Sequence, residues 1–241
     1  MDTLSASAAS GIRARLESLE LLANNLANQA TAGFKADRAA YNLYSALPTR
    51  WAAAPVLPVV ERQWTDFSQG TLTSTGNPTD VALSGPGFFM VRGPSGVLYT
   101  RNGNFRVGAG GEWLTEDGFP VLGPGGQPVR VDPSRPFEVS RTGEILQEGV
   151  VVARLGVVEF DRPETLRKRR GVYFETVSAA QRPRPARAEV YQGKLEGANL
   201  NPAEAAVRLV TVMRQFEMLQ RALRLGSEMN RKAVEEVARS R

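Results

Sequence analysis

The sequence predicts an α+β fold in which N- and C-terminal coiled-coil helices flank an inserted, mainly antiparallel β domain. Glycine marks the change of architecture, because 20 of the 23 glycines lie between Gly70 and Gly197. Apolar residues in both terminal segments recur at alternating spacings of three and four, the period of a helical seam. The glycine-rich middle instead alternates short apolar runs with turn residues, as antiparallel strands do.

The first helix is predicted from a 3-4 apolar repeat that stops near Gly33. We assign residues 1–45 to this N-terminal helical segment and residues 46–66 to an extended linker, since prolines from Pro48 to Pro58 break helical structure. The predicted seam of this helix consists of Ile12, Leu16, Leu19 and Leu26.

Residues 67–197 are assigned to a β-rich domain. Phe88–Val91 is a candidate buried strand, and the Asn102-Gly103 pair is typical of a two-residue hairpin turn. The arginine-rich segment 162–170 is interpreted as a solvated loop, because it lacks the interleaved aromatic residues on which nucleic-acid bases would stack.

Residues 198–241 are predicted to contain the C-terminal helix. Asn201 is a favourable N-cap, Pro202 suits the first helical position, and Glu204 stands where a capping-box carboxylate reaches back to the cap amide. The single strongly polar seam residue, Asn230, is expected to set helix register rather than to add stability. The predicted seam consists of Leu209, Val212, Phe216, Leu219, Leu223 and Asn230.

The two seams allow two interpretations. They form either a self-contained helical hairpin or surfaces through which copies of the chain assemble. One antiparallel partner would bury only one side of each helix, and that burial barely offsets the entropy lost on ordering the chain. This balance favours packing against neighbouring subunits as well.

Composition excludes the commonest catalytic chemistries. The chain has no cysteine and no histidine, so disulfides, Cys or His metal sites and Ser/His/Asp arrangements are excluded. We assign no catalytic residue, cofactor or metal, and expect no small-molecule substrate. A formal net charge of +5 is a weak attraction for anionic polymers without a reading surface, so no nucleic-acid partner is expected. No apolar run is long enough for membrane insertion, and no secretory signal is recognisable.

A class of a different kind, a basic polymer-binding or polysaccharide-processing β protein, is the alternative. Glycoside hydrolysis needs only a carboxylate pair, and Glu112, Glu116, Asp117 and Glu144 are available. These acids lie in turn-rich segments where exposed carboxylates are ordinary. This alternative would also leave the terminal seams unexplained.

Several motifs occur along nearly the whole chain. The principal motif positions are Asn24, Asn25, Leu26, Ala27, Asn28, Gly33, Phe34, Gly76, Asn77, Pro78 and Asp80, and Lys35 directly follows Phe34. Three further stretches are residues 66–70, 99–105 and 193–201, and a fourth is Arg214–Met218. Together these motifs resemble those of the bacterial flagellar rod and hook family.

This resemblance implies a structural subunit of the flagellar basal-body rod, and not an enzyme. The terminal helices would form an inner coiled-coil layer of the tubular rod that transmits torque, with the β domain facing outward. The implied partners are copies of the chain, other rod subunits and the flagellar export apparatus. The C-terminal motifs are most similar to proximal rod subunits, with a distal rod subunit as the alternative.

Overall fold

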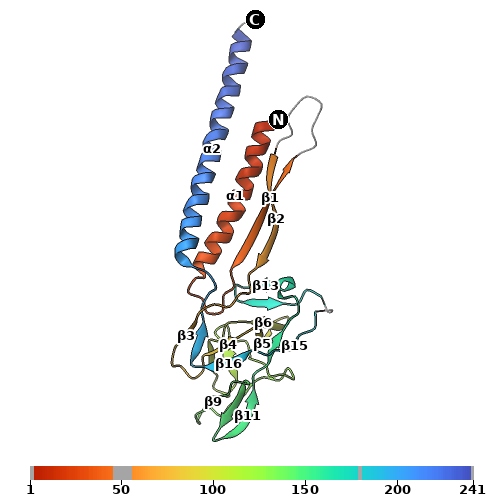
Figure 1. Ribbon diagram of the computed structural model, residues 1–241, viewed down its shortest axis with the longest axis vertical. Coiled ribbons are helices and arrows are strands. Elements are labelled where there is room, and N and C mark those ends of the chain that lie inside the picture. Colours follow the sequence, from red (N-terminus) through yellow and green to blue (C-terminus); the bar gives the residue numbers. More distant parts are fainter. Residues whose placement is uncertain (1–2, 46–55, 179–180, 240–241) are drawn as a thin grey trace. The chain divides into compact units, whose positions relative to one another are not determined.

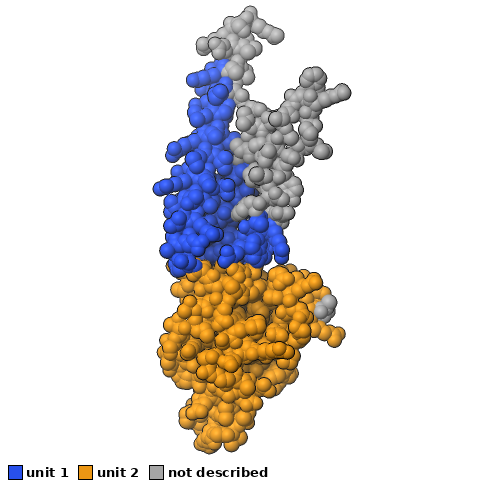
Figure 2. All heavy atoms as spheres, viewed as in Figure 1, with its two compact units in different colours: residues 1–27, 37–64, 201–241 blue, residues 28–36, 65–200 orange. Residues whose placement is uncertain are grey.

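A computed structural model describes residues 3–45, 56–178 and 181–239, and it confirms an α+β chain. The chain folds into two compact units, shown in different colours in Figure 2. Unit 1 comprises residues 1–27, 37–64 and 201–241, and unit 2 comprises residues 28–36 and 65–200. The chain therefore passes from one unit to the other after residues 27, 36, 64 and 200.

Unit 1 is built on two helices, α1 (Thr3–Ala27) and α2 (Pro202–Arg239), which pack against each other (Figure 1). Two strands, β1 (Asp37–Ser45) and β2 (Val56–Thr65), form a two-stranded sheet, and β1 also contacts α1. At 1.5 Å per residue, the 25 residues of α1 can cover only about 37 Å of α2, whose 38 residues extend for about 57 Å.

The predicted boundaries of the N-terminal segment are wrong in two places. The helix ends at Ala27, and residues 37–45, expected to be part of the helical segment, form strand β1. Residues 56–65 of the expected linker form strand β2, whereas residues 46–55 lie outside the described residues. Pro58 is tolerated in β2 because each strand of a two-stranded sheet has a free edge that needs no N–H donor.

Unit 2 is a mainly antiparallel β structure (Figure 1). Its largest sheet has six strands in the order β13-β14-β6-β5-β12-β15, and a three-stranded sheet has the order β11-β10-β9. The remaining strands pair as β16-β4, β17-β3 and β7-β8. The strands are β3 (Leu72–Ser74), β4 (Val81–Ser84), β5 (Phe88–Gly93), β6 (Gly96–Thr100), β7 (Phe105–Val107), β8 (Trp113–Thr115), β9 (Glu138–Val139), β10 (Glu144–Gln147), β11 (Val150–Arg154), β12 (Val157–Glu159), β13 (Arg167–Arg169), β14 (Tyr173–Glu175), β15 (Arg184–Pro185), β16 (Glu189–Gln192) and β17 (Lys194–Glu196).

The core of unit 2 includes a residue far outside the predicted β domain. Phe34 is fully buried in the same cluster as Phe89, Trp113 and Ile145. A second cluster mixes aromatic and aliphatic residues, and Phe88 and Phe174 lie edge to face within it, with ring centroids 5.8 Å apart. Unit 2 is therefore completed by residues that precede β1 in the sequence.

Two local predictions within the β domain are wrong. The Asn102-Gly103 pair does not close a hairpin, because β6 and β7 lie in different sheets. Gly103 is needed there for close approach, since a Cβ atom would lie 1.6 Å from the Val81 carbonyl oxygen. The segment 162–170 is not an irregular loop either, because it contains a short 3-10 helix (Pro163–Thr165) and the edge strand β13.

Candidate functional site

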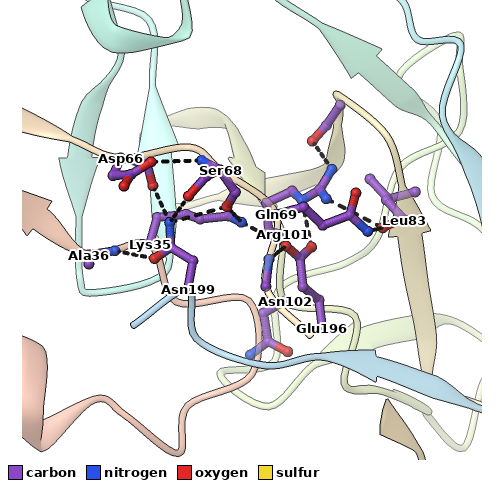
Figure 3. A network of polar contacts seen from close by, with 12 residues as sticks. Lys35, Ala36, Asp66, Ser68, Gln69, Leu83, Arg101, Asn102, Glu196 and Asn199 are labelled. Atoms are coloured by element: carbon purple, nitrogen blue, oxygen red, sulfur yellow. Dashed lines mark hydrogen bonds and ion pairs between the residues drawn. The ribbon is translucent and has the colours of Figure 1, made fainter. Parts of the chain in front are cut away.

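A network of buried charges joins three distant segments of unit 2 around Glu196 (Figure 3). The fully buried Glu196 carboxylate accepts a hydrogen bond at Oε1 from Lys35 Nζ at 2.7 Å and one at Oε2 from Arg101 Nε at 2.7 Å. The Gly70 N–H donates to the same Oε1 at 2.9 Å. We call Lys35, Arg101, Glu196 and Asn199 the junction network.

Both cations of the junction network have further acceptors. Lys35 Nζ donates to the Ser68 carbonyl at 2.6 Å, and Arg101 Nη1 donates to the carbonyls of Gly85 and Gly87 at 2.8 and 2.9 Å. Burial lowers the pKa of Lys35, because the ammonium is removed from water, and the Glu196 carboxylate opposes this shift. Such a group of buried charges persists only when each charge has partners.

Asn199 joins the same segments through its side-chain amide. Its Oδ1 accepts the Ala36 N–H at 2.8 Å, and its Nδ2 donates to the carbonyls of Asp66 and Ser68 at 2.7 and 3.1 Å. The Asp66 N–H in turn donates to the Ala36 carbonyl at 2.8 Å. The junction network therefore holds together the parts of unit 2 that lie next to three of the four passages between units.

The basic residue Lys168 supports this arrangement from strand β13. Its Nζ donates to the Lys35 carbonyl at 2.6 Å and lies 4.0 Å from the centroid of the Phe34 ring. Side chains alternate along a strand, so the flanking Arg167 and Arg169 point the other way and both pair with Glu175. The arginine-rich segment 162–170, which was expected to be a solvated loop, therefore also stabilises the fold of unit 2 through Lys168.

The first family motif is divided between the two units. Asn24, Asn25, Leu26 and Ala27 end α1, whereas Asn28, Gly33 and Phe34 belong to unit 2. Asn25 is buried, and its amide donates to the Asp37 carbonyl at 2.8 Å and accepts the Asp37 N–H at 3.0 Å. This residue therefore ties the end of α1 to the start of β1.

The backbone conformation at position 33 requires a glycine. Its φ of +67° is in the left-handed region, and a Cβ atom would lie 2.1 Å from the Asn102 nitrogen. The Gly33 N–H donates to the Glu196 carbonyl at 2.7 Å. Glu196 is thus bonded through both its backbone and its side chain to residues that precede β1.

The second family motif forms a turn between β3 and β4. Asp80 is buried, and its carboxylate accepts from Thr75 Oγ1 at 2.7 Å and from Asn77 Nδ2 at 3.2 Å. Gly76 has a φ of +72°, and the Pro78 carbonyl accepts from a β16 side-chain amide at 2.9 Å. These motif residues stabilise the fold of unit 2.

Helix α2 carries apolar residues on two opposite faces. The predicted seam residues Leu209, Val212, Phe216, Leu219 and Leu223 are all half-buried, on the side where α1 packs. Val207 is exposed, and at about 100° per residue Phe216, nine positions later, lies on the opposite side of the helix. Met218, Leu225 and Met229 share the exposed face with Val207. The Asn230 side chain lies outside what the structure describes.

In α1 the residues buried most deeply are not those of the predicted seam. Gly11, Ala14, Ser18 and Asn25 are buried, and small side chains let helix backbones approach closely. Ile12, Leu19 and Leu26 are half-buried, and Leu16 is 47% exposed. The leucine seam therefore lies beside the buried face and is left partly uncovered by the chain itself.

Neither α1 nor α2, over the residues described, is long and apolar enough to cross a membrane. Within the same residues, no group of three or more Asp, Glu, His or Cys side chains is placed to hold a metal ion. A cavity of about 310 Å³ in unit 2 has Phe67, Phe88, Phe160, Lys35 and Arg101 among its lining residues. Both of these cations already bond to Glu196.

Sequence reasoning did not identify the junction network as a site. Lys35 and Glu196 alone are 161 positions apart, so no local spacing connects the members of the network. The available signal was the occurrence of Lys35, Arg101 and Glu196 inside three of the family-like stretches, where charged residues stand among glycines and apolar residues.

Comparison with known proteins agrees with the motifs. Residues 82–153 match the family described as flagellar hook protein FlgE/F/G D1 domain, and residues 191–236 match the flagellar basal body rod FlgEFG protein C-terminal family. The flagellar basal-body rod protein FlgF of Caulobacter vibrioides is 33% identical over 226 residues, which cover 92% of each chain. FlgF of Salmonella typhimurium is 34% identical over 217 residues, covering 83% of this chain and 84% of that one. FlgG of Buchnera aphidicola subsp. Schizaphis graminum is 27% identical over 246 residues, covering 92% and 95%.

Proposed function

Because this chain belongs to the family of flagellar basal-body rod proteins, which are structural subunits of the basal body, we propose that it is a subunit of the proximal rod. In this proposal its helices join those of other rod subunits and of further copies in an inner coiled-coil layer. The subunit transmits torque and reaches the basal body through the flagellar export apparatus.

The observation that carries the proposal is the apolar surface that each helix leaves exposed. In α2, Val207, Met218, Leu225 and Met229 are exposed on the side opposite the half-buried seam, and in α1 the seam residue Leu16 is exposed. Burying large apolar side chains is favourable by about 1.5 to 3 kcal/mol each. Packing among neighbouring helices would recover this free energy, whereas a self-contained hairpin would not.

The proposed torque transmission is supported by the way the chain connects its two units. The backbone joins the units at four passages, after residues 27, 36, 64 and 200, and each passage can carry force from one unit to the other. Inside unit 2, Lys35, Glu196 and Asn199 bind the adjoining segments to one another. A load on one connection would therefore be shared by the others.

The preference for the proximal rod rests on the relatives. The FlgF sequences named above are 33% and 34% identical to this chain, whereas the FlgG sequence is 27% identical. The difference supports a FlgF-type subunit, with a distal, FlgG-type subunit as the alternative.

The test is a strain that lacks only this chain. We expect its purified basal bodies to end before the rod is complete and to lack the FlgG-type subunit, since distal subunits are added onto proximal ones. Restoring the gene should restore complete rods that contain the chain by mass spectrometry. Complete rods without the chain would refute the proposed function, and stalled rods that retain the FlgG-type subunit would refute the proximal assignment.

A further inference from the structure

The outer edge of the hairpin formed by β10 and β11 is an uncovered apolar surface on unit 2. We propose that β11 is a contact site for a second copy of this chain within the assembled rod. This inference rests on the proposed function and adds to it a specific surface outside the terminal helices. Figure 1 shows the hairpin projecting from the rest of unit 2.

Exposure changes sharply across the hairpin. Ile145 and Gln147 of β10 are buried, whereas Val150, Val151 and Val152 of β11 are 64%, 53% and 46% exposed. Strand β11 is the last strand in the order β11-β10-β9, and no strand among the described residues pairs with its outer backbone edge. Consecutive β-branched residues on an open edge readily pair with another chain.

Other sheet edges of unit 2 carry features that oppose such pairing. At the far edge of the same sheet, Gln192 Oε1 accepts the Val139 N–H of β9 at 3.0 Å. The edge strand β13 consists of cationic residues, and the edge strand β15 contains Pro185. Charged residues and proline usually protect sheet edges from pairing with another chain. In β11 the only such residue is Arg154, at the end of the strand.

The shape of the hairpin is set before any partner binds. Glu148 and Gly149 have φ values of +53° and +80°, as a tight two-residue turn requires. Glu148 Oε2 pairs with Arg135 Nη1 at 2.8 Å, and Gln147 Nε2 donates to the Asp132 carbonyl at 2.9 Å. A preorganised edge loses little conformational entropy on binding.

The size of the patch indicates which partner it suits. Three half-exposed valines offer much less than the roughly 1,200 Å² that a stable two-protein interface buries in total. The edge is thus too small to capture a free protein or peptide by itself. A second copy already held nearby through its helices would bind as part of one assembly, where the effective concentration is high.

The absence of native cysteine allows a direct test. Val151→Cys is compared with the control Val177→Cys, which alters a valine that is 61% exposed elsewhere in unit 2. Each variant is supplied as the only copy of the chain and labelled with a maleimide, both as dilute monomer and in purified basal bodies. In a further strain, a photoreactive benzophenone amino acid is incorporated in place of Val151 during translation, so that the exported chain carries the crosslinker into the basal body.

We expect both variants to label fully as monomers. In basal bodies, labelling of Val151→Cys relative to Val177→Cys should fall at least tenfold, and photolysis should yield a covalent dimer of this chain. An unchanged labelling ratio, or crosslinking only to a different protein, would overturn the inference and leave the proposed function intact. Absence of the chain from purified basal bodies would overturn both.

Discussion

Replacing Glu196 with glutamine should destabilise unit 2 severely. The substitution preserves the shape of the side chain but removes the only carboxylate that both Lys35 and Arg101 contact in the described structure. It also places an amide NH₂ where the carboxylate accepts hydrogen bonds from Lys35, Arg101 and the Gly70 N–H, so that two donors face each other. Removing one partner of a buried ion pair costs about 3 to 5 kcal/mol, because the remaining charge is left uncompensated. That loss is a large fraction of the roughly 5 to 15 kcal/mol that stabilises a typical domain.

The assay is urea unfolding followed by tryptophan fluorescence, in a background in which Trp51 and Trp64 are replaced by phenylalanine so that the signal comes from the buried core residue Trp113. With a slope of about 1 to 3 kcal/mol per molar urea, the midpoint for Glu196→Gln should fall by at least about 1 M. Glu148→Gln is the control, because Glu148 and its partner Arg135 are both more than half exposed, so its midpoint should change little.

A double-mutant cycle sharpens this test. Lys35→Met removes one of the two buried cations, so combining it with Glu196→Gln should cost less than the sum of the two single changes. The electrostatic argument would be refuted if Glu196→Gln unfolded at the wild-type midpoint, or if the two changes were additive.

Three further outcomes are expected. Burial is the largest cause that raises the pKa of the Tyr173 hydroxyl above its ordinary value of 10.0. As pH rises, the hydroxyl therefore loses its proton in the unfolded chain before it does so in the folded chain. The free energy of unfolding should then fall as the pH rises above 10.0. The urea midpoint should fall less for Tyr173→Phe than for the wild type when the pH is raised from below 10.0 to above it. An equal fall in both proteins would contradict a role for the Tyr173 hydroxyl. Gly33→Ala should lower thermal stability by more than about 1 kcal/mol, whereas Gly226→Ala, where a Cβ meets open space within α2, should be neutral or stabilising. Leu219→Asp should prevent rod completion without changing the thermal transition of unit 2, because Leu219 is half-buried on the side of α2 that packs against α1 within unit 1; normal motility of that strain would show that assembly does not need this helix packing.

The helical ends could be predicted because their signals are local. Asn201 caps α2 as predicted, and its Oδ1 accepts the N–H groups of Ala203 and Glu204 at 3.0 and 3.4 Å. The capping-box role of Glu204 is wrong, since its carboxylate pairs with Arg208 Nη2 at 2.7 Å. An ion pair one turn along the helix competes for the same carboxylate, and spacing alone does not rank the two partners.

The apolar repeat predicted that α1 is helical but not which face is buried. Hydrophobic periodicity marks large side chains such as Leu16, whereas close packing selected Ala14 and Ser18. The Asn25 motif was visible in the sequence, but the bridge to Asp37 depends on strand β1, whose residues were assigned to the N-terminal helical segment. Long-range contacts such as Lys35 to Glu196 leave no periodic signal at all.

The distance along the chain between Lys35 and Glu196 has a consequence for biosynthesis. These two residues are 161 positions apart, and both are needed to close the core that also encloses Phe34. At about 5 to 20 residues per second, a ribosome needs on the order of ten seconds or more to connect them. Throughout that time the nascent chain contains Lys35 but not Glu196, the carboxylate with which Lys35 pairs in the folded structure. Unit 2 therefore closes only near the end of translation, which leaves the growing polypeptide open to chaperones for most of its synthesis.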